Sequence, residues 1–297
     1  MADLPPSLAY YGSFQGVMQI LKHQSLPLFQ ADELRDPFLP NKFTQLDFDC
    51  QALFERSVKY MTSAILGKAA PKGNPNHPLQ KAIRRWRGEN RFSDEAEIRE
   101  SLVGLLPAMV EKAFNNAQEI HAEWLNYVEN KRLLPFFENA NNSELWLLEA
   151  ERYSGVVIKF KCAEDSIFEQ CTAVRYGKKP PKTVSIGDCA DLMVGDINEM
   201  PADFEKLLLA QNYHFRAQKE WRLLLERTSE DELCLSFPCE LIQSIYIGAA
   251  VPSTKVELLS ELAEQLSSKI NVYRSVCSDT SYEFNFEKLN GDSEVAP

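Results

Sequence analysis

The chain has 297 residues, of which 44% are hydrophobic and 25% are charged, and these proportions exclude a disordered chain, a collagen and a disulfide-stapled miniprotein. Lys and Arg number 32 against 43 Asp and Glu, which gives a net charge of −11 and a pI near 5.0. This balance argues against nonspecific coating of nucleic acid or of an anionic membrane. A local basic cleft stays compatible with it.

The cysteine and histidine patterns point to a reduced, metal-free protein. The seven cysteines are scattered and form no C-x-x-C pair, and the four histidines have no ligand spacing. No targeting segment is visible and no apolar run approaches the roughly 18 residues of a membrane span. We therefore expect a cytoplasmic protein without a metal site or a membrane partner.

The first zone, residues 8 to 40, predicts a strand, a helix and a second strand. Ala9–Tyr11 is a short β-prone run, and Leu26–Phe29 is another. Between them, four apolar residues follow one another at helical spacing, namely Phe14, Val17, Met18 and Leu21. Pro37 and Pro40 close the zone because proline disfavours a continuing helix.

The second zone, about 45 to 133, predicts helices, since it carries two long apolar stripes at helical spacing. A loop rich in proline and glycine at 70–78 separates them. The densest basic cluster of the chain follows this loop and consists of Lys81, Arg84, Arg85, Arg87 and Arg91. Trp86 and Phe92 are interleaved with it and either stack on a base or pack on the core. A solvated helical face explains the same cluster.

The rest of the chain, from about 134, is rich in strands. β-branched and aromatic runs occur at 155–160, 172–176, 221–226, 233–237 and 244–248. Helical spacing appears at 201–211, and again at 256–270 before two further strand-like runs, 271–276 and 282–286. The pattern predicts one α+β domain with a mixed or antiparallel sheet core, a helical insertion at about 45–133, and a C-terminal helix plus strands.

The strongest chemical pattern is an alternation near residue 220. The chain contains no Walker loop, G-x-G-x-x-G, G-x-S-x-G or H-E-x-x-H motif. Gln218, Glu220 and Arg222 alternate, so a strand would project all three from one face. A Gln-x-Glu pair there is able to orient the two hydroxyls of a ribose, and the Glu to stabilise an oxocarbenium ion. The structural alternative is a Glu220–Arg222 ion pair.

Several motifs, taken in order, resemble the bacterial domain-of-unknown-function family 2971, which has no established general activity. The chain departs from the family pattern at Arg35, at Glu149 and at Gln218, where Asn, Tyr and Glu are usual. The matching segments run over most of the chain, with the helical zone as a variable insert: Tyr10-Tyr11 with Met18–Leu21, Leu34–Phe38, Leu145–Val156, Val174–Tyr176, Phe215–Arg222 and Ile245–Gly248.

The same layout is similar, more weakly, to ADP-ribosyltransferases, and this resemblance implies NAD as cofactor. It implies Glu220 as the catalytic carboxylate and Gln218 as the residue on the acceptor side. Tyr10 or Tyr11 would pack on the adenosine or nicotinamide portion. The pyrophosphate would be neutralised by an arginine, Arg35 or Arg175. The His-x-Thr and Ser-Thr-Ser signatures of such enzymes are absent from the sequence.

The remaining candidate ligand-binding residues each have a structural alternative. Trp146 also suits core packing, and Asp36 before Pro37 suits a turn. His214 neighbours the Gln-x-Glu segment and is kept as an acid or base. The last two candidate ligand-binding residues are Tyr176 and Arg222.

Two functions follow. The first is an ADP-ribosyltransferase-like or NAD glycohydrolase-like enzyme, acting as a toxin or phage-defence effector. The second is a nonenzymatic sensor or adaptor that binds an anionic partner through segment 81–91. The isolated arginines favour a small anionic ligand, and a protein or nucleic-acid acceptor is left open.

Overall fold

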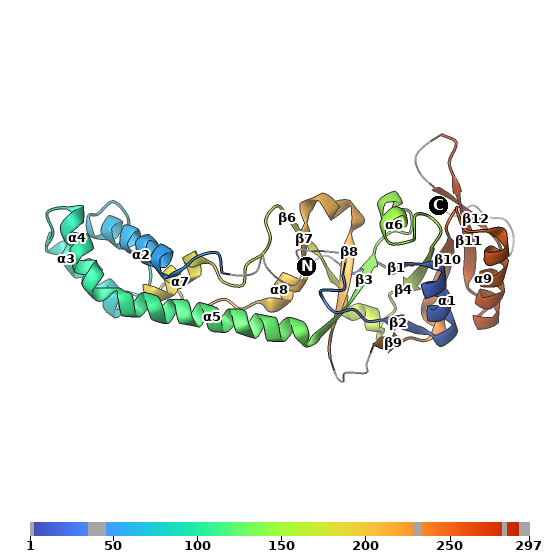
Figure 1. The fold of residues 1–297 in the computed structure, drawn as a ribbon, viewed down its shortest axis with the longest axis horizontal. Coiled ribbons are helices and arrows are strands. Elements are labelled where there is room, and N and C mark those ends of the chain that lie inside the picture. The colour runs from blue at the N-terminus through green and yellow to red at the C-terminus, as the bar shows by residue number, and fades with distance from the viewer. Residues whose placement is uncertain (1–2, 35–45, 228–232, 281–283, 291–297) are drawn as a thin grey trace. The chain divides into compact units, whose positions relative to one another are not determined.

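The computed structural model describes residues 3–34, 46–227, 233–280 and 284–290, and the chain divides into two compact units. The first unit comprises Met1–Leu39, Asn130–Lys179 and Leu209–Pro297, and the second comprises Pro40–Glu129 and Pro180–Leu208. The first is built on a large mixed sheet and the second on helices (Figure 1). The predicted α+β fold is thereby confirmed.

An eight-stranded sheet organises the first unit, in the order β12-β11-β10-β4-β1-β3-β8-β5. β10 and β11 are parallel, while the other neighbouring pairs are antiparallel. α9 (Ser253–Leu266) connects the parallel pair, as a parallel connection requires. The strands are β1 (Ser7–Gly12), β3 (Lys131–Phe137), β4 (Val156–Lys161), β5 (Thr172–Ala173), β8 (Glu220–Glu226), β10 (Ile242–Ile247), β11 (Asn271–Cys277) and β12 (Phe284–Lys288).

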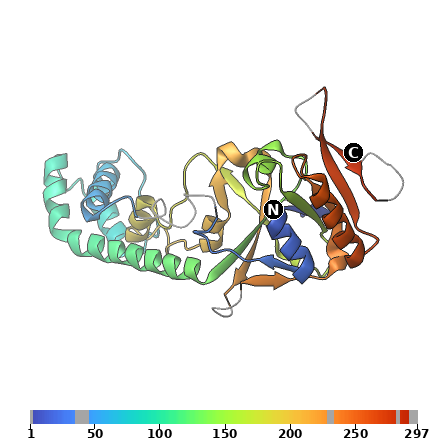
Figure 2. The same ribbon diagram turned by 45° about the vertical axis from the view of Figure 1, so that its right-hand side comes forward.

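One face of this sheet packs against α1 (Phe14–His23) and α9, which lie side by side (Figure 2). α1 begins at Ser13, whose hydroxyl accepts a hydrogen bond from the Gly16 N–H and so caps the helix. The apolar stripe of α1 then meets sheet residues such as Tyr10 and Phe136. We call this the α1/α9 face. Each large apolar side chain buried there contributes about 1.5–3 kcal/mol of transfer free energy.

The opposite face of the sheet carries a second cluster rich in aromatic side chains, which we call the aromatic face. α6 (Ser143–Leu148) contributes Trp146 to it. The sheet contributes Tyr11, Phe137 and Tyr246. Tyr246 stacks on Tyr273 of the neighbouring strand, with ring centroids 5.1 Å apart. Because successive side chains of a strand alternate, Tyr10 and Tyr11 belong to different faces.

Two small pairs of strands complete the first unit. β2 (Ser25–Pro27) pairs with β9 (Cys234–Ser236), and β6 (Arg175–Gly177) runs parallel to β7 (Ala210–Asn212). The predicted single strand at 172–176 is therefore two strands, since β5 joins the large sheet and β6 leaves it. Three 3₁₀ helices link these strands, at Ile167–Gln170, Tyr213–Gln218 and Cys239–Leu241.

Two glycines allow the backbone to approach closely beside the aromatic face. A Cβ atom on Gly248 would lie 2.1 Å from the Tyr153 carbonyl oxygen, and one on Gly155 would lie 2.3 Å from the Gly12 oxygen. Both contacts are far below van der Waals distance, so only glycine fits. The preceding turn has three successive residues with positive φ, Glu151 to Tyr153, which is a strained arrangement for residues with a side chain.

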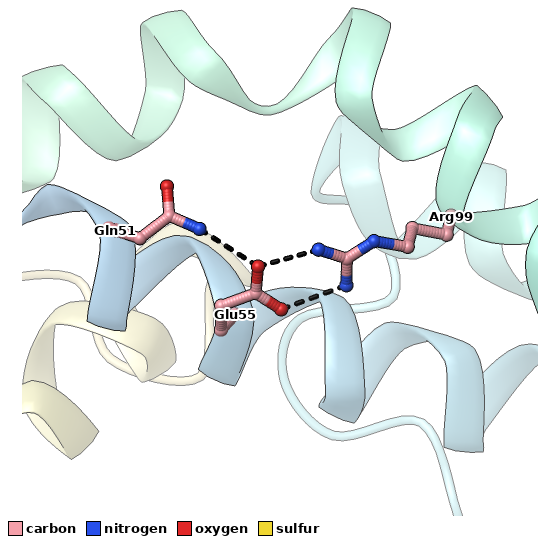
Figure 3. Close-up of polar contacts among 3 residues, drawn as sticks. All are labelled: Gln51, Glu55 and Arg99. Carbon is pink, nitrogen blue, oxygen red and sulfur yellow. Dashed lines mark hydrogen bonds and ion pairs between the residues drawn. The ribbon is translucent and has the colours of Figure 1, made fainter.

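The second unit is helical and has its own core. Its helices are α2 (Cys50–Ile65), α3 (Pro78–Gly88), α4 (Glu95–Leu105), α5 (Pro107–Glu129), α7 (Ile186–Met193) and α8 (Phe204–Leu208). The apolar stripes of α2, α3, α4, α5 and α7 form one buried cluster. α7 begins with a capping box between Ser185 and Asp188. On the surface, Arg99 of α4 donates two hydrogen bonds, at 2.8 and 2.6 Å, to the Glu55 carboxylate of α2 (Figure 3).

Segment 180–208 belongs to this helical unit although it lies between strands in the sequence. α8 lies within the predicted helical run 201–211, whereas α7 was not predicted. Among the described residues, no helix combines the length and the apolar character needed to cross a membrane.

Candidate functional site

Glu220 opens β8 and is the centre of the candidate site. The residue before it, Lys219, has a left-handed backbone with φ 50°, and Gln218 lies at the end of a 3₁₀ helix. The prediction that Gln218, Glu220 and Arg222 share one strand face is therefore wrong for Gln218. A left-handed residue breaks the alternation on which that prediction rests. Gln218 is nonetheless buried next to the start of the strand.

Glu220 and Arg222 form a buried ion pair within β8. Arg222 Nε donates to Glu220 Oε1 at 2.6 Å, and only 6% and 1% of the two residues are exposed. Glu220 lies opposite Phe137 of β3, so its side chain projects on the aromatic face. Within the described part of the chain, Glu220 Oε2 accepts no hydrogen bond from protein.

Tyr176 of β6 joins this pair. Its hydroxyl oxygen accepts a hydrogen bond from the Glu220 backbone N–H at 2.7 Å. Burial raises the pKa of Tyr176 to about 12, and the nearby Glu220 carboxylate acts in the same direction. The hydroxyl is therefore protonated at neutral pH and has its own proton left to donate. Tyr176 is half-buried, so part of its side chain is exposed to solvent.

The two predicted tyrosines of β1 separate. Tyr10 packs on the α1/α9 face against Phe136, whereas Tyr11 lies on the aromatic face with Glu220. The Tyr11 hydroxyl donates to the Asn139 carbonyl oxygen at 2.7 Å. Burial raises the pKa of both phenols well above the usual range. Only Tyr11 therefore shares a sheet face with Glu220.

The other candidates lie in differing environments. Trp146 is fully buried, and its indole N–H donates to the Ala140 carbonyl oxygen at 2.8 Å, an arrangement typical of core packing. Arg175 and His214 are exposed, on β6 and on the 3₁₀ helix that precedes β8. The predicted residues Arg35 and Asp36 lie outside the described residues.

The basic cluster on α3 divides into a surface part and a structural part. Lys81, Arg84 and Arg85 are exposed, whereas Arg87 donates from Nη1 to the Ala69 carbonyl oxygen at 3.0 Å. Trp86 is only 6% exposed and packs edge-on against Phe92. Base stacking and core packing were the two alternatives predicted for Trp86, and in this structure its ring packs on the core.

Two features beside Glu220 escaped the sequence analysis. Glu138, directly after β3, accepts from the Trp221 indole N–H at 3.3 Å and pairs with Lys219 at 2.9 Å. On the 3₁₀ helix that ends at Gln218, the ring of Tyr213 is approached by Arg216 of the same helix and by Lys178, which follows β6. No sequence motif links these residues, because Glu138 is 83 residues from Trp221 and Lys178 lies in a different segment from Tyr213.

The described residues bring no group of three or more metal-ligating side chains together. Comparison of the chain with protein families, with curated proteins and with solved structures finds no match. The two family resemblances therefore stay predictions, and the function is argued from the site itself.

Proposed function

We propose that this chain is an enzyme that cleaves the nicotinamide–ribose bond of NAD and passes the ADP-ribose to water or to an acceptor. The observation that carries the proposal is the Glu220–Arg222 pair with Tyr176 at its rim. A carboxylate with one oxygen held by an arginine and the other without a protein partner is oriented before substrate arrives. Such a carboxylate suits a reaction whose transition state develops positive charge on a ribose.

Glu220 would act through its charge. Breaking the bond to nicotinamide leaves an oxocarbenium ion, and a carboxylate in a poorly solvated site stabilises that cation more strongly than water does. Glu220 Oε2 would also accept a hydrogen bond from a ribose hydroxyl. Arg222 Nε fixes the orientation of Oε1.

The neighbouring groups supply further contacts in this proposal. The Tyr176 hydroxyl has a proton to donate to a ribose or phosphate oxygen of the substrate. Tyr11 lies on the same sheet face as Glu220, and Gln218 is buried beside the start of β8. Tyr10 is left out of the proposed site because it projects from the other face.

Titration calorimetry with NAD tests this proposal. We expect wild-type protein to bind NAD and Glu220→Gln to bind it without cleaving it. Glu226→Gln is the matched control, because Glu226 lies in the same strand but its side chain is 69% exposed. No heat of binding and no rise in melting temperature with NAD would overturn the proposal.

A second candidate function is supported by the surface of α3. Lys81, Arg84 and Arg85 are exposed at helical spacing, and within the described residues none of them forms an ion pair. A sensor or adaptor would use this stripe to bind an anionic partner. It predicts binding that weakens with salt and with the double substitution R84Q/R85Q, and that is unchanged by Glu220→Gln.

A further inference from the structure

A second basic surface includes the 3₁₀ helix that ends just before Glu220 in the chain. Two segments of the first unit contribute to it, residues 171–179 and residues 209–219, and neither contains an acidic residue. Together they hold five lysines and arginines, Arg175, Lys178, Lys179, Arg216 and Lys219. β6 and β7 pair these segments in parallel, with Gly177 opposite Asn212. Over the whole chain, acidic residues outnumber basic ones and the net charge is −11. These two segments, in contrast, carry only basic charged residues.

The centre of the surface is a tyrosine that carries two cations. The Arg216 guanidinium lies 4.3 Å from the centroid of the Tyr213 ring, and the Lys178 ammonium lies 5.7 Å from it. Tyr213 is 39% exposed, and both cations are exposed as well. The ring holds the two charges near each other by cation–π attraction without neutralising either of them.

In the part of the chain that the structure describes, these two charges have no acidic partner. Within the described residues, neither Lys178 nor Arg216 forms an ion pair, and the same holds for the exposed Arg175 and Lys179. Lys219 is different, because it pairs with Glu138. Unpaired cations that are held in place are available to an external anion at a low entropic cost.

We propose that Lys178, Tyr213 and Arg216 form a docking surface for a single-stranded nucleic acid. Exposed cations bind a small anion weakly because water screens each contact. A polyanion contacts several of them at once and releases its condensed counterions. An exposed tyrosine and a planar guanidinium add surfaces on which a base is able to stack. The arrangement therefore fits a phosphate chain with accessible bases better than a free phosphate.

One part of this surface, the 3₁₀ helix, lies just before Glu220 in the chain. The 3₁₀ helix that carries Tyr213 and Arg216 ends at Gln218, two residues before Glu220, and the Asn142 amide donates to the Ala217 carbonyl oxygen at 3.1 Å. A nucleic-acid strand bound at Tyr213 would be an acceptor of ADP-ribose close in sequence to the proposed catalytic carboxylate. Binding itself does not depend on NAD chemistry, so the two proposals fail separately.

Fluorescence anisotropy with labelled oligonucleotides of about 12 nucleotides tests the surface, since single-strand sites span roughly 4–16 nucleotides. Single-stranded DNA and RNA of one sequence form two arms, and anionic phospholipid vesicles form a third. The measurement is made without NAD, at several salt concentrations between about 50 and 200 mM. We expect both oligonucleotides, or one of them, to bind, with affinity that falls as salt rises.

The substitutions separate this surface from other basic ones. K178Q/R216Q is expected to weaken binding about tenfold and to lower the salt slope by about 1.4, because two phosphate contacts are lost. Y213A is expected to weaken binding about tenfold while Y213F binds as wild type does, because stacking needs the ring and not the hydroxyl. K22Q/K269Q, which removes two exposed lysines elsewhere on the first unit, is the charge-matched control.

The proposal is overturned by any of four results. The first is no binding of either oligonucleotide, and the second is binding that K178Q/R216Q reduces no more than K22Q/K269Q does. The third is binding to vesicles but not to oligonucleotides. If R84Q/R85Q alone abolishes binding, the surface of α3 is the interface instead. Unchanged melting temperatures would show that all variants fold.

Discussion

Arg222 Nε lies 2.6 Å from Glu220 Oε1, and both residues are almost completely buried at the start of β8. Two charges removed from water are costly, and in this pair each compensates the other. The pair therefore has a structural role in addition to the catalytic role proposed for Glu220. Experiments must separate these two roles.

Removing Arg222 from this pair should destabilise the fold strongly. Arg222→Met leaves the Glu220 carboxylate buried without its partner, and we expect the free energy of unfolding to fall by about 3–5 kcal/mol. Replacing both residues, as in E220L/R222M, should cost much less because no charge is left uncompensated. Urea unfolding of the single and double variants measures the difference. Equal destabilisation by the single and the double substitution would contradict this reading.

Gly248 should be intolerant of any side chain. In Gly248→Ala, the added Cβ would lie 2.1 Å from the Tyr153 carbonyl oxygen, so the backbone must shift. We expect a loss of about 1–3 kcal/mol in urea unfolding. Gly104→Ala in α4 is the control, because an added Cβ meets nothing within 4 Å there. That variant should be stabilised by up to about 1 kcal/mol. A neutral Gly248→Ala would refute the close approach.

His121 of α5 should make stability depend on pH. Partial burial lowers the pKa of His121 below its ordinary value of 6.5. The unfolded chain therefore binds more protons than the folded one near and below that pH. Stability is fully present above about pH 6.5 and falls as the pH drops through the unfolded-state value. His121→Gln should flatten the profile of unfolding free energy between about pH 5 and 7. An unchanged profile would show that His121 is not responsible.

The cysteines should differ sharply in reactivity. Burial raises the pKa of Cys171 and of Cys189 to about 12, while Cys234 and Cys277 are exposed. Since the thiolate is the reactive form, a thiol reagent at about pH 8 should modify the exposed pair first. Mass spectrometry of the partly modified protein identifies the order. Early modification of Cys171 or Cys189 in folded protein would contradict the burial described above.

Much of the sheet followed from local pattern. β1, β2 and β11 lie on the β-prone runs predicted for them, and α1 and α9 lie where helical spacing predicted them. Helical spacing is sufficient for α1 and α9 because burial on one face of a helix imposes its period.

The misses have identifiable physical causes. β3 was not predicted because Pro135 interrupts its apolar run, and proline is rare in central strands. Within the described residues, β3 pairs with β1 only at Phe137. Pro135 has no backbone N–H to donate, but this costs little because few hydrogen bonds join these two strands. Glu138 escaped notice for the same reason, since it follows this strand.

The site was harder to predict because it depends on tertiary contacts. The left-handed Lys219 takes Gln218 out of the strand alternation, and nothing in the residue types announces that break. Tyr176 and Glu220 are 44 residues apart, so their hydrogen bond has no local signature. Lys178, whose ammonium lies over the Tyr213 ring, is likewise distant from Tyr213 in the sequence. The Glu220–Arg222 pair, by contrast, was visible as an i, i+2 spacing within a strand.

The most direct test of the central proposal is release of nicotinamide from NAD by purified protein. Wild type and Glu226→Gln should release it at equal rates, and Glu220→Gln should lose at least about 100-fold of that rate while keeping a native circular dichroism spectrum. A Glu220→Gln protein that releases nicotinamide as fast as wild type, or a wild type that releases none, would contradict the proposed role of Glu220.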